Sequence, residues 1–276
     1  MVKDNKIRAN HREVEVLEAL RQLGGAARNA NLAELLGVSE ETIRRTTKAL
    51  AKADLVRRVH GGSYLPDSDA GAGVFSRLGL RQGEKGRIGA AVVALIPDGS
   101  CVFLDVGSTT VFVAQALNAR RGLDVVTNSL NAAQALAEQG GNRVFVAGGR
   151  LRRDQMGMFG SDTIEFIRNF NVDVAIMSVD AIDAKRGFLL MGTDEAAVAR
   201  AAIRQAQQTI IVADHQKFGQ KAPLVVCPPR EIDVVVTDQP LGPEMALSFR
   251  DWGVTAHDAA TDIATETAKM NDKDAA

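Results

Sequence analysis

The sequence predicts an α/β protein of two units: an N-terminal winged helix-turn-helix followed by a larger, mainly parallel α/β domain. Within the first 64 residues, short helical patterns precede an alternating segment that ends in a Gly-Gly hairpin signal. From Glu84 onward, Val- and Ile-rich segments alternate with Ala-rich helical segments, which is typical of a parallel sheet covered on both faces. We therefore expect a helix-turn-helix unit over 1–64, a linker over 65–83, the α/β domain over 84–257 and a polar, disordered tail over 258–276.

Composition excludes several classes of protein. With 276 residues, of which 46% are hydrophobic, the chain has enough apolar material for two cores. It holds no run of about 18 uncharged apolar residues, and its first residues are polar, so we expect neither a membrane span nor a secretory signal. Cys101 and Cys227 lie in apolar, strand-like runs without other Cys or His at ligand spacing. We therefore expect a cytoplasmic protein with buried free thiols and with no metal, cofactor or membrane partner.

The net charge of −1 conceals an asymmetry between the two units. Residues 1–62 carry 12 Lys and Arg against 8 Asp and Glu, whereas the remainder carries 21 against 26. A basic first unit joined to an acidic body indicates that only the first unit faces a polyanion.

The first unit is predicted to hold three helices. They are expected from an apolar stripe at Val14, Leu17 and Leu20, from residues 31–36, and from Ser39 to about Ala53. Gly37 can adopt the left-handed conformation that closes the second helix, and Ser39 is a good N-cap for the third. Residues 55–59 then alternate and meet His60-Gly61-Gly62, which predicts a two-stranded wing.

The third helix has the two faces that a DNA-reading helix needs. Ile43 and Leu50 point inward, and the opposite side carries a stripe at helical spacing, made of Glu41, Arg44, Arg45, Lys48 and Lys52. Arginine can donate two hydrogen bonds to guanine or clamp a phosphate. The commoner meaning of such a stripe is a solvated helix face, but its coincidence with a tight turn and a wing favours DNA binding.

We predict contacts to a double-stranded DNA operator from the recognition helix and from the wing. The residues are Ser39, Thr42, Arg44, Arg45, Lys48, Arg57, Arg58 and His60. Because one helix-turn-helix reads only a few base pairs, we expect a homodimer or a homotetramer.

The second unit is predicted to bind an anion where its first strand ends. That strand runs directly into Asp105-Val-Gly-Ser-Thr-Thr110 and then into a helix. Gly107 permits a close approach of the backbone, and the following hydroxyls surround exposed amides at a helix N-terminus, which suits a phosphate. Polar or Gly residues recur at the ends of further strand segments: Asn128 and Ser129, Gly148 and Gly149, Asp180, and Asp214 with Lys217. Since ligands of parallel sheets bind at the carboxyl ends of strands, we expect these ends to form one site.

The helix-turn-helix segment resembles the DeoR family of repressors. The resemblance rests on VSEETIRR, KAL and RRVHGG in the first unit, and on EKGRI (84–88), LDVGSTT (104–110), VVTNSLN (125–131), AGG (147–149), VDAID (179–183) and ADHQKFG (213–219) in the second. Together these cover most of residues 10–257. The resemblance implies a sensor domain with a fold related to ribose-5-phosphate isomerase and a phosphorylated sugar or polyol as effector.

The resemblance also assigns effector-binding residues. It implies that Asp105, Gly107, Ser108, Thr109 and Thr110 line the phosphate end, with Asn128, Ser129, Gly148, Gly149, Asp180 and Lys217 around it. The chain departs from the family pattern at Thr46-Thr47, where Asp-Leu is usual, and at Ser178 and Ala181, where glycines are usual. Arg200 stands where Lys is more frequent. We expect the side chains at 178 and 181 to narrow the ligand site.

Two alternatives compete with a regulator. A sugar-phosphate isomerase or deaminase would need a general base, and Asp105, Asp180 and Glu195 are available carboxylates. An enzyme, however, has no use for a recognition helix and wing. A purely architectural DNA-binding protein would leave the polar strand ends of the second unit without a role.

Overall fold

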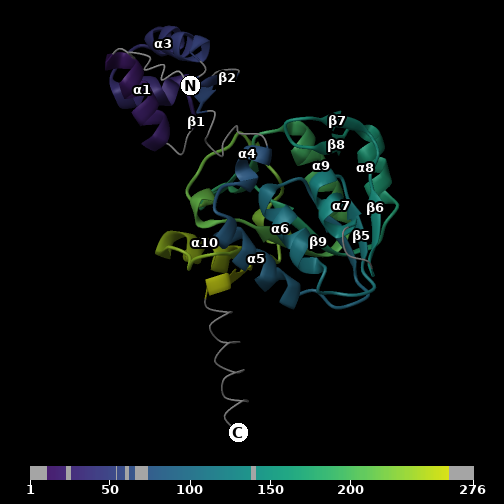
Figure 1. The fold of residues 1–276 in the computed structure, drawn as a ribbon. Coiled ribbons are helices and arrows are strands. Elements are labelled where there is room, and N and C mark those ends of the chain that lie inside the picture. The colour runs from purple at the N-terminus through teal and green to yellow at the C-terminus, as the bar shows by residue number, and fades with distance from the viewer. Residues whose placement is uncertain are drawn as a thin grey trace. The chain divides into compact units, whose positions relative to one another are not determined.

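The computed structural model describes residues 11–22, 26–53, 55–59, 62–65, 74–137 and 141–260. The chain separates into two compact units, Met1–Arg77 and Leu78–Ala276. Figure 1 labels those of their helices and strands for which there is room.

The first unit is a three-helix core with a small antiparallel sheet. Its elements are α1 (His11–Gln22), β1 (Ala26–Arg28), α2 (Asn29–Leu36), α3 (Glu40–Lys52), β2 (Arg57–Val59) and β3 (Gly62–Tyr64). Val16, Leu20, Leu32, Ile43 and Leu50 form the centre of the core, because each helix turns one apolar stripe inward. The three predicted helices are thereby confirmed, but Val14, expected in the apolar stripe of the first helix, is 41% exposed, and Val16 lies in the core instead.

The predicted wing is present. Strands β2 and β3 pair antiparallel, with Arg57 opposite Tyr64 and Val59 opposite Gly62. His60 and Gly61, at the expected turn, lie outside the described residues. Strand β1, which the sequence did not predict, pairs antiparallel with β3 and makes the sheet three-stranded.

The segment expected to be a linker contains regular structure. Within 65–83, the helix α4 (Val74–Leu78) is formed, and α5 (Gln82–Ala94) begins before Glu84. A helix of five residues spans little more than one turn, so it leaves no apolar periodicity in the sequence.

The second unit is built on a seven-stranded sheet in the order β15-β14-β12-β9-β4-β5-β6. Every neighbouring pair in it is parallel. The strands are β4 (Cys101–Leu104), β5 (Asp124–Thr127), β6 (Arg143–Val146), β9 (Val172–Ser178), β12 (Ala206–Val212), β14 (Val234–Thr237) and β15 (Thr255–Asp258). Six of these strands coincide with segments rich in Val and Ile, so the predicted mainly parallel α/β class is confirmed.

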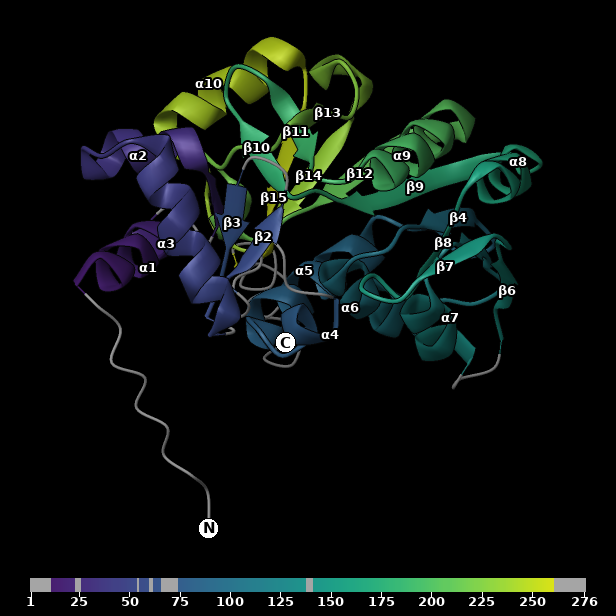
Figure 2. The same cartoon turned by 90° about the horizontal axis from the view of Figure 1, so that it is seen from above.

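Helices cover both faces of this sheet (Figure 2). On one face pack α5, α6 (Ser108–Leu117) and α7 (Leu130–Ala137), which contribute Ile88, Val113 and Leu136 to one core cluster. On the other pack α8 (Ser161–Arg168), α9 (Thr193–Gln205) and α10 (Pro243–Trp252), which contribute Ile167 and Phe249 to a second cluster. Alternate strand residues serve the two clusters, as the pleat of a strand requires.

Smaller elements lie beside the sheet. They are the hairpin of β7 (Arg150–Arg152) and β8 (Gly157–Phe159), the sheet of β10 (Ala181–Asp183), β11 (Gly187–Leu190) and β13 (Leu224–Val225), and the 3₁₀ turns η1 (His215–Lys217) and η2 (Pro229–Glu231). None of the described helices has the length and apolar character needed to cross a membrane. Within the same described ranges, no three His, Cys, Asp or Glu side chains gather as a metal site.

Candidate functional site

The recognition helix α3 begins at a capped N-terminus. The side chain of Ser39 accepts a hydrogen bond from the backbone N–H of Thr42 at 3.2 Å, and the two hydroxyls lie 2.9 Å apart. Thr46 donates its hydroxyl to the carbonyl of Thr42 at 3.0 Å. Ser39 and Thr42 therefore fix the start of the helix, and both predicted contacts lie at its tip.

The two predicted faces of α3 are confirmed. Ile43, Thr47 and Leu50 are buried, and the stripe of Glu41, Arg44, Arg45, Lys48 and Lys52 is exposed along its whole length. Thr47 donates its hydroxyl to the carbonyl of Arg44 at 3.3 Å, so this departure from the family pattern places a satisfied hydroxyl on the inner face.

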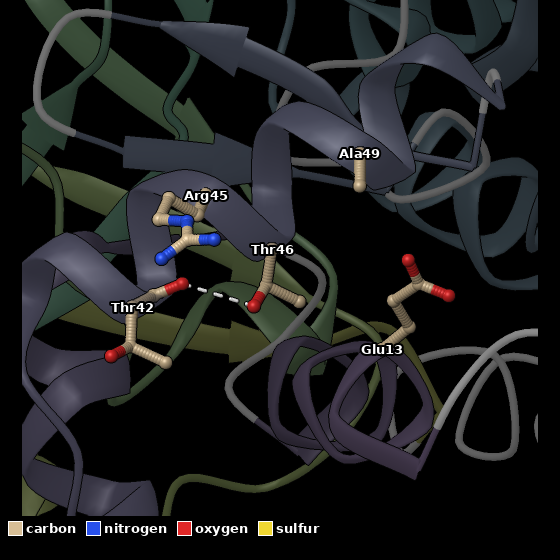
Figure 3. A pocket seen from close by; sticks show the side chains of 5 residues that line it. All are labelled: Glu13, Thr42, Arg45, Thr46 and Ala49. Atoms are coloured by element: carbon tan, nitrogen blue, oxygen red, sulfur yellow. Dashed lines mark hydrogen bonds between the residues drawn. The ribbon is translucent and has the colours of Figure 1, made fainter.

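Both arginines of α3 are accessible to a partner. The guanidinium of Arg44 is 57% exposed and lies 3.8 Å from the Glu41 carboxylate, an exposed ion pair of little energetic weight. Arg45 lines a shallow pocket of about 270 Å³ with Thr42, Thr46, Ala49 and, from α1, Glu13 (Figure 3).

The wing is described in part. Arg58 is exposed on β2, and Arg57 lies on the same strand opposite Tyr64. His60, the remaining predicted wing contact, lies outside the described residues.

The predicted site in the second unit forms along one edge of the sheet. The carboxyl ends expected to meet belong to β12, β9, β4, β5 and β6, and these five strands are consecutive neighbours. The structure therefore brings together the loops that hold the predicted effector residues.

The loop after β4 is held by hydrogen bonds within itself and to the end of β9. The hydroxyl of Thr110 donates to the carbonyls of Asp105 and Gly107 at 3.1 and 2.9 Å. A carboxylate oxygen of Asp105 accepts a hydrogen bond from the backbone N–H of Ser178 at 2.9 Å, which ties this loop to the end of β9. Ser108 and Thr109 are buried, and because they open α6 their backbone amides form the positive end of that helix.

Residues of the loop after β5 make hydrogen bonds that stabilise the fold. Ser129 accepts the N–H of Ala132 at 3.2 Å and so caps α7. The side-chain amide of Asn128 donates to the carbonyl of Met158 at 2.9 Å. Its oxygen Oδ1 is buried and has no hydrogen-bond partner among the described residues, which is an unusual state for a buried amide.

The two glycines after β6 differ in role. Gly149 has φ of +135°, and a Cβ there would collide with the hydroxyl of Thr163, so it is required by packing. Gly148 is exposed and faces open space, while its carbonyl accepts the Thr163 hydroxyl at 2.6 Å.

The remaining predicted residues lie on neighbouring loops. Asp180 accepts the backbone N–H of Met191 at 2.8 Å. Lys217 is half-buried in η1, whose start is capped by Asp214. Beside it, the Nδ1 atom of His215 lies 2.8 Å from a carboxylate oxygen of the buried Asp238, which orients the imidazole.

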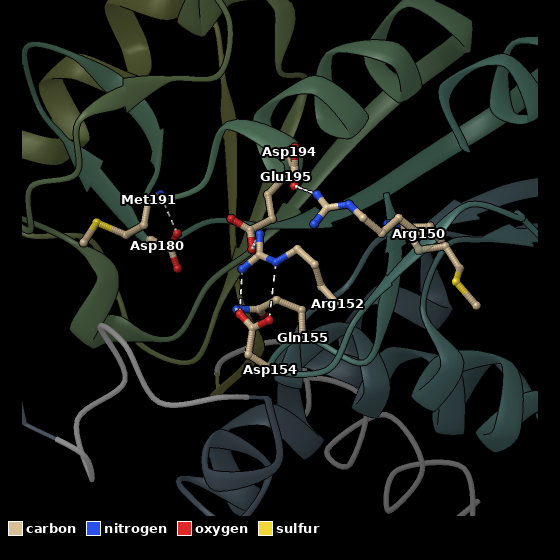
Figure 4. A network of polar contacts seen from close by, with 10 residues as sticks. Arg150, Arg152, Asp154, Gln155, Asp180, Met191, Asp194 and Glu195 are labelled. Atoms are coloured by element: carbon tan, nitrogen blue, oxygen red, sulfur yellow. Dashed lines mark hydrogen bonds and ion pairs between the residues drawn. The ribbon is translucent and has the colours of Figure 1, made fainter. Parts of the chain in front are cut away.

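The most extensive polar network at this edge was not predicted from the sequence (Figure 4). Arg152 of β7 lies between Asp154 and Glu195, at 2.6 and 3.1 Å, and Arg150 pairs with Asp194 at 2.7 Å. Burial opposes the charge of Arg152, but the hydrogen bond to Asp154 and the charge of Glu195 outweigh it and raise the pKa of the guanidinium. The same pair lowers the pKa of Asp154 despite the burial of its carboxyl. A run of charged residues directly after Gly148-Gly149 was the available signal.

An exposed basic helix in a winged helix-turn-helix, joined to a unit with polar loops at one sheet edge, defines a DNA-binding regulator with a sensor domain. Comparison with known families agrees. Residues 12–69 match the DeoR-like helix-turn-helix domain, and residues 80–239 match the DeoR C terminal sensor domain. The chain belongs to the DeoR family of transcriptional regulators, as the resemblance of its motifs predicted.

Several curated proteins are similar over most of the chain. The glycerol-3-phosphate regulon repressor of Escherichia coli (strain K12) is 36% identical over 82% of this chain and 89% of that protein. The protein of the same name from Haemophilus influenzae is 38% identical over 76% of this chain and 82% of that protein. The HTH-type transcriptional repressor GlcR of Bacillus subtilis (strain 168) is 33% identical over 83% of this chain and 88% of that protein.

Similar solved structures are more distant. Ribose 5-phosphate isomerase from Plasmodium falciparum is 14% identical with a TM-score of 0.37, over 49% of this chain and 52% of that chain. The structure of eIF2B beta from Chaetomium thermophilum is 13% identical with a TM-score of 0.40, over 80% of this chain and 60% of that chain. The chain thus spans less than two thirds of either structure, and neither likeness bears on function.

Proposed function

We propose that this regulator is a repressor that binds a double-stranded DNA operator through α3 and its wing. The exposed stripe of α3 carries this proposal, because it presents Arg44, Arg45 and Lys48 on the side opposite the core. Such side chains reach base edges and phosphates when a recognition helix enters the major groove. The relatives bear the name of repressor, which supports this direction of control.

The effector of the proposed repressor is a phosphorylated sugar or polyol. The amide end of α6 at Ser108 and Thr109 supplies the phosphate site, and the adjoining strand ends supply polar groups for the rest of the ligand. Two relatives are named for the glycerol-3-phosphate regulon, so glycerol 3-phosphate is the first compound to test.

An enzymatic role has less support. Of the carboxylates that offered themselves as general bases, Asp105 and Asp180 accept backbone N–H groups, and Glu195 pairs with Arg152. These contacts give each of the three carboxylates a structural role in the described part of the chain. The assembly of two or four copies on a two-fold symmetric operator is proposed from the short reach of one recognition helix.

The test begins with the operator. Genomic fragments retained by the purified protein are sequenced and confirmed by gel shift at one fixed salt concentration, since affinity for DNA depends steeply on salt. The retained operator is then titrated in the presence of phosphorylated sugars and polyols and of their unphosphorylated parents. We expect a phosphorylated compound to change operator affinity and its parent to have no effect. Failure to retain any specific fragment would contradict the regulator, and equal effects of both compounds would contradict the phosphate site.

A further inference from the structure

The hairpin β7–β8 is fixed to the loop that follows β5. The backbone N–H of Met158 donates to the carbonyl of Asn128 at 2.8 Å, and the N–H of Leu130 donates to the carbonyl of Met156 at 2.9 Å. The side chain of Asn128 adds a third bond, to the carbonyl of Met158. The hairpin is therefore held in place beside the proposed effector site.

The side chain of Arg152 points to the face of the hairpin that meets this site. Arg152 is the cross-strand partner of Gly157, and cross-strand partners project to the same face of a ladder. A Cβ on Gly157 would collide with Val106 and lie 3.2 Å from the carbonyl oxygen of Asn128. Val106 belongs to the loop of the proposed phosphate site, so Arg152 faces toward that loop. Its guanidinium lies 5.2 Å from the ring centre of the buried Phe159.

The two partners of Arg152 lie far from each other in the sequence. Asp154 follows it in the hairpin, and Glu195 lies in the first turn of α9. The side chains of Arg152 and Glu195 are only 24% and 14% exposed, whereas those of Arg150 and Asp194 are 68% and 36% exposed. Figure 4 shows the inner pair beside the outer one. The inner pair, Arg152 and Glu195, is thus largely buried and leaves a small part of each side chain open to solvent.

The charge of this cluster identifies the group that it suits. One guanidinium between two carboxylates has a net charge of −1, which disfavours a second anion such as a phosphate. A hydroxyl group, in contrast, both donates and accepts, so a carboxylate beside a guanidinium satisfies it completely. Two further observations point to a polar ligand here: the buried Oδ1 of Asn128 has no hydrogen-bond partner among the described residues, and Gly148 borders open space.

We propose that Arg152 and Glu195 bind hydroxyl groups of the effector, away from its phosphate, and so select a polyol phosphate over a simple phosphate ester. This inference rests on the proposed function and extends it to the other end of the ligand. The phosphate contributes affinity at α6, and the Arg152–Glu195 pair contributes selectivity, because a site built to bond hydroxyls rejects an analogue without them.

Calorimetry on the full chain tests whether Arg152 and Glu195 contribute selectivity while the phosphate site contributes affinity. Glycerol 3-phosphate, ribose 5-phosphate and glucose 6-phosphate are compared with ethyl phosphate, which has the same charged group and no hydroxyls. We expect the wild type to prefer the tightest polyol phosphate over ethyl phosphate by about tenfold or more. In Arg152→Gln and Glu195→Gln the preference should fall to about threefold or less, with the affinity for ethyl phosphate unchanged. Arg150→Gln, which alters the exposed pair beside them, is the matched control and should keep the wild-type preference.

The outcomes separate this inference from the proposed function. If the variants lose affinity for ethyl phosphate and polyol phosphates equally, Arg152 is a phosphate ligand and the inference is overturned. Unchanged selectivity in both variants overturns it as well. If the wild type binds neither ethyl phosphate nor any polyol phosphate, the proposed phosphate site itself fails and the inference falls with it. Melting temperatures check the fold of each variant, and Glu195→Gln, which preserves shape, decides alone if Arg152→Gln unfolds.

Discussion

The side chain of Ser178 occupies the space that a side chain at Gly107 would need. A Cβ at position 107 would collide with the hydroxyl oxygen of Ser178 and lie 3.0 Å from its Cβ. The backbone N–H of Ser178 also donates to the carboxylate of Asp105 at 2.9 Å. The loop after β4 and the end of β9 are therefore fitted to each other at the proposed phosphate site.

This fit predicts that Gly107→Ala destabilises the protein and that Ser178→Gly relieves the effect. Forced overpacking typically costs about 1–3 kcal/mol, and removal of the colliding hydroxymethyl group should restore most of it. Urea unfolding of both single variants and of the double variant gives the coupling energy.

Gly86→Ala is the matched control for the same unfolding series. Gly86 is an exposed position inside α5 where a Cβ would meet nothing within 4 Å. Alanine there should stabilise the protein by about 0.5–1 kcal/mol. Additive effects of Gly107→Ala and Ser178→Gly would show that the two residues do not compete for space.

The recognition helix predicts a second result. Arg44→Ala and Arg45→Ala should each weaken specific operator binding by about 1–3 kcal/mol at constant salt, while the melting temperature stays close to that of the wild type. Both side chains are exposed and support no part of the core. Arg168→Ala removes an equally exposed arginine from α8 in the other unit and should leave affinity unchanged. If both variants of α3 bind the operator with wild-type affinity, this face of the helix does not contact DNA.

Several features followed directly from the sequence because they depend on local pattern. The buried parallel strands carry continuous Val and Ile, and Ile43 and Leu50 mark the inner face of α3 through their spacing. In contrast, β15 reads Thr-Ala-His-Asp, and as a half-exposed edge strand it needs no apolar run. The Arg152–Glu195 pair joins residues from β7 and α9 that only the tertiary fold brings together. A local sequence pattern does not predict such a contact.

The cysteines predict resistance to alkylation. Burial and the charge of Glu231 raise the pKa of the Cys227 thiol to about 12, and burial with Asp124 and Asp173 raises that of Cys101. At pH 8 the thiolate fraction of Cys227 is then on the order of one part in ten thousand. Because the thiolate is the nucleophile, both residues should react with iodoacetamide far more slowly in the folded protein than in urea. Rapid modification of the folded protein at pH 8 would contradict this environment.

The start of the second unit can be tested with two fragments. Arg81 lies 3.3 Å from the buried carboxylate of Asp214, and the carbonyl of Leu80 accepts the ammonium of the buried Lys85 at 2.8 Å. A fragment of residues 84–276 lacks both partners, whereas residues 78–276 keep them. Loss of one partner of a buried ion pair costs about 3–5 kcal/mol, so the shorter fragment should melt at a clearly lower temperature. Equal melting temperatures would support the boundary at Glu84 that the sequence predicts.

The phosphate site predicts that Ser108→Asp abolishes the response to the effector and leaves operator binding intact. The added carboxylate lies at the amide end of α6, where the proposed phosphate binds, and two anions repel each other at that position. A ligand that cannot bind cannot shift the equilibrium between two states of the protein. Calorimetry should therefore show no detectable binding of the phosphorylated effector by this variant, while a gel shift without effector matches the wild type.

Ser161→Asp supplies the control, because Ser161 is also the first residue of a helix that follows a glycine N-cap, in α8. It is exposed and is not one of the proposed effector residues, so the same charge change should leave effector binding unchanged. If Ser108→Asp binds the effector as tightly as the wild type does, the phosphate binds elsewhere. If Ser161→Asp loses binding to the same degree, the effect of Ser108→Asp is a general consequence of added charge.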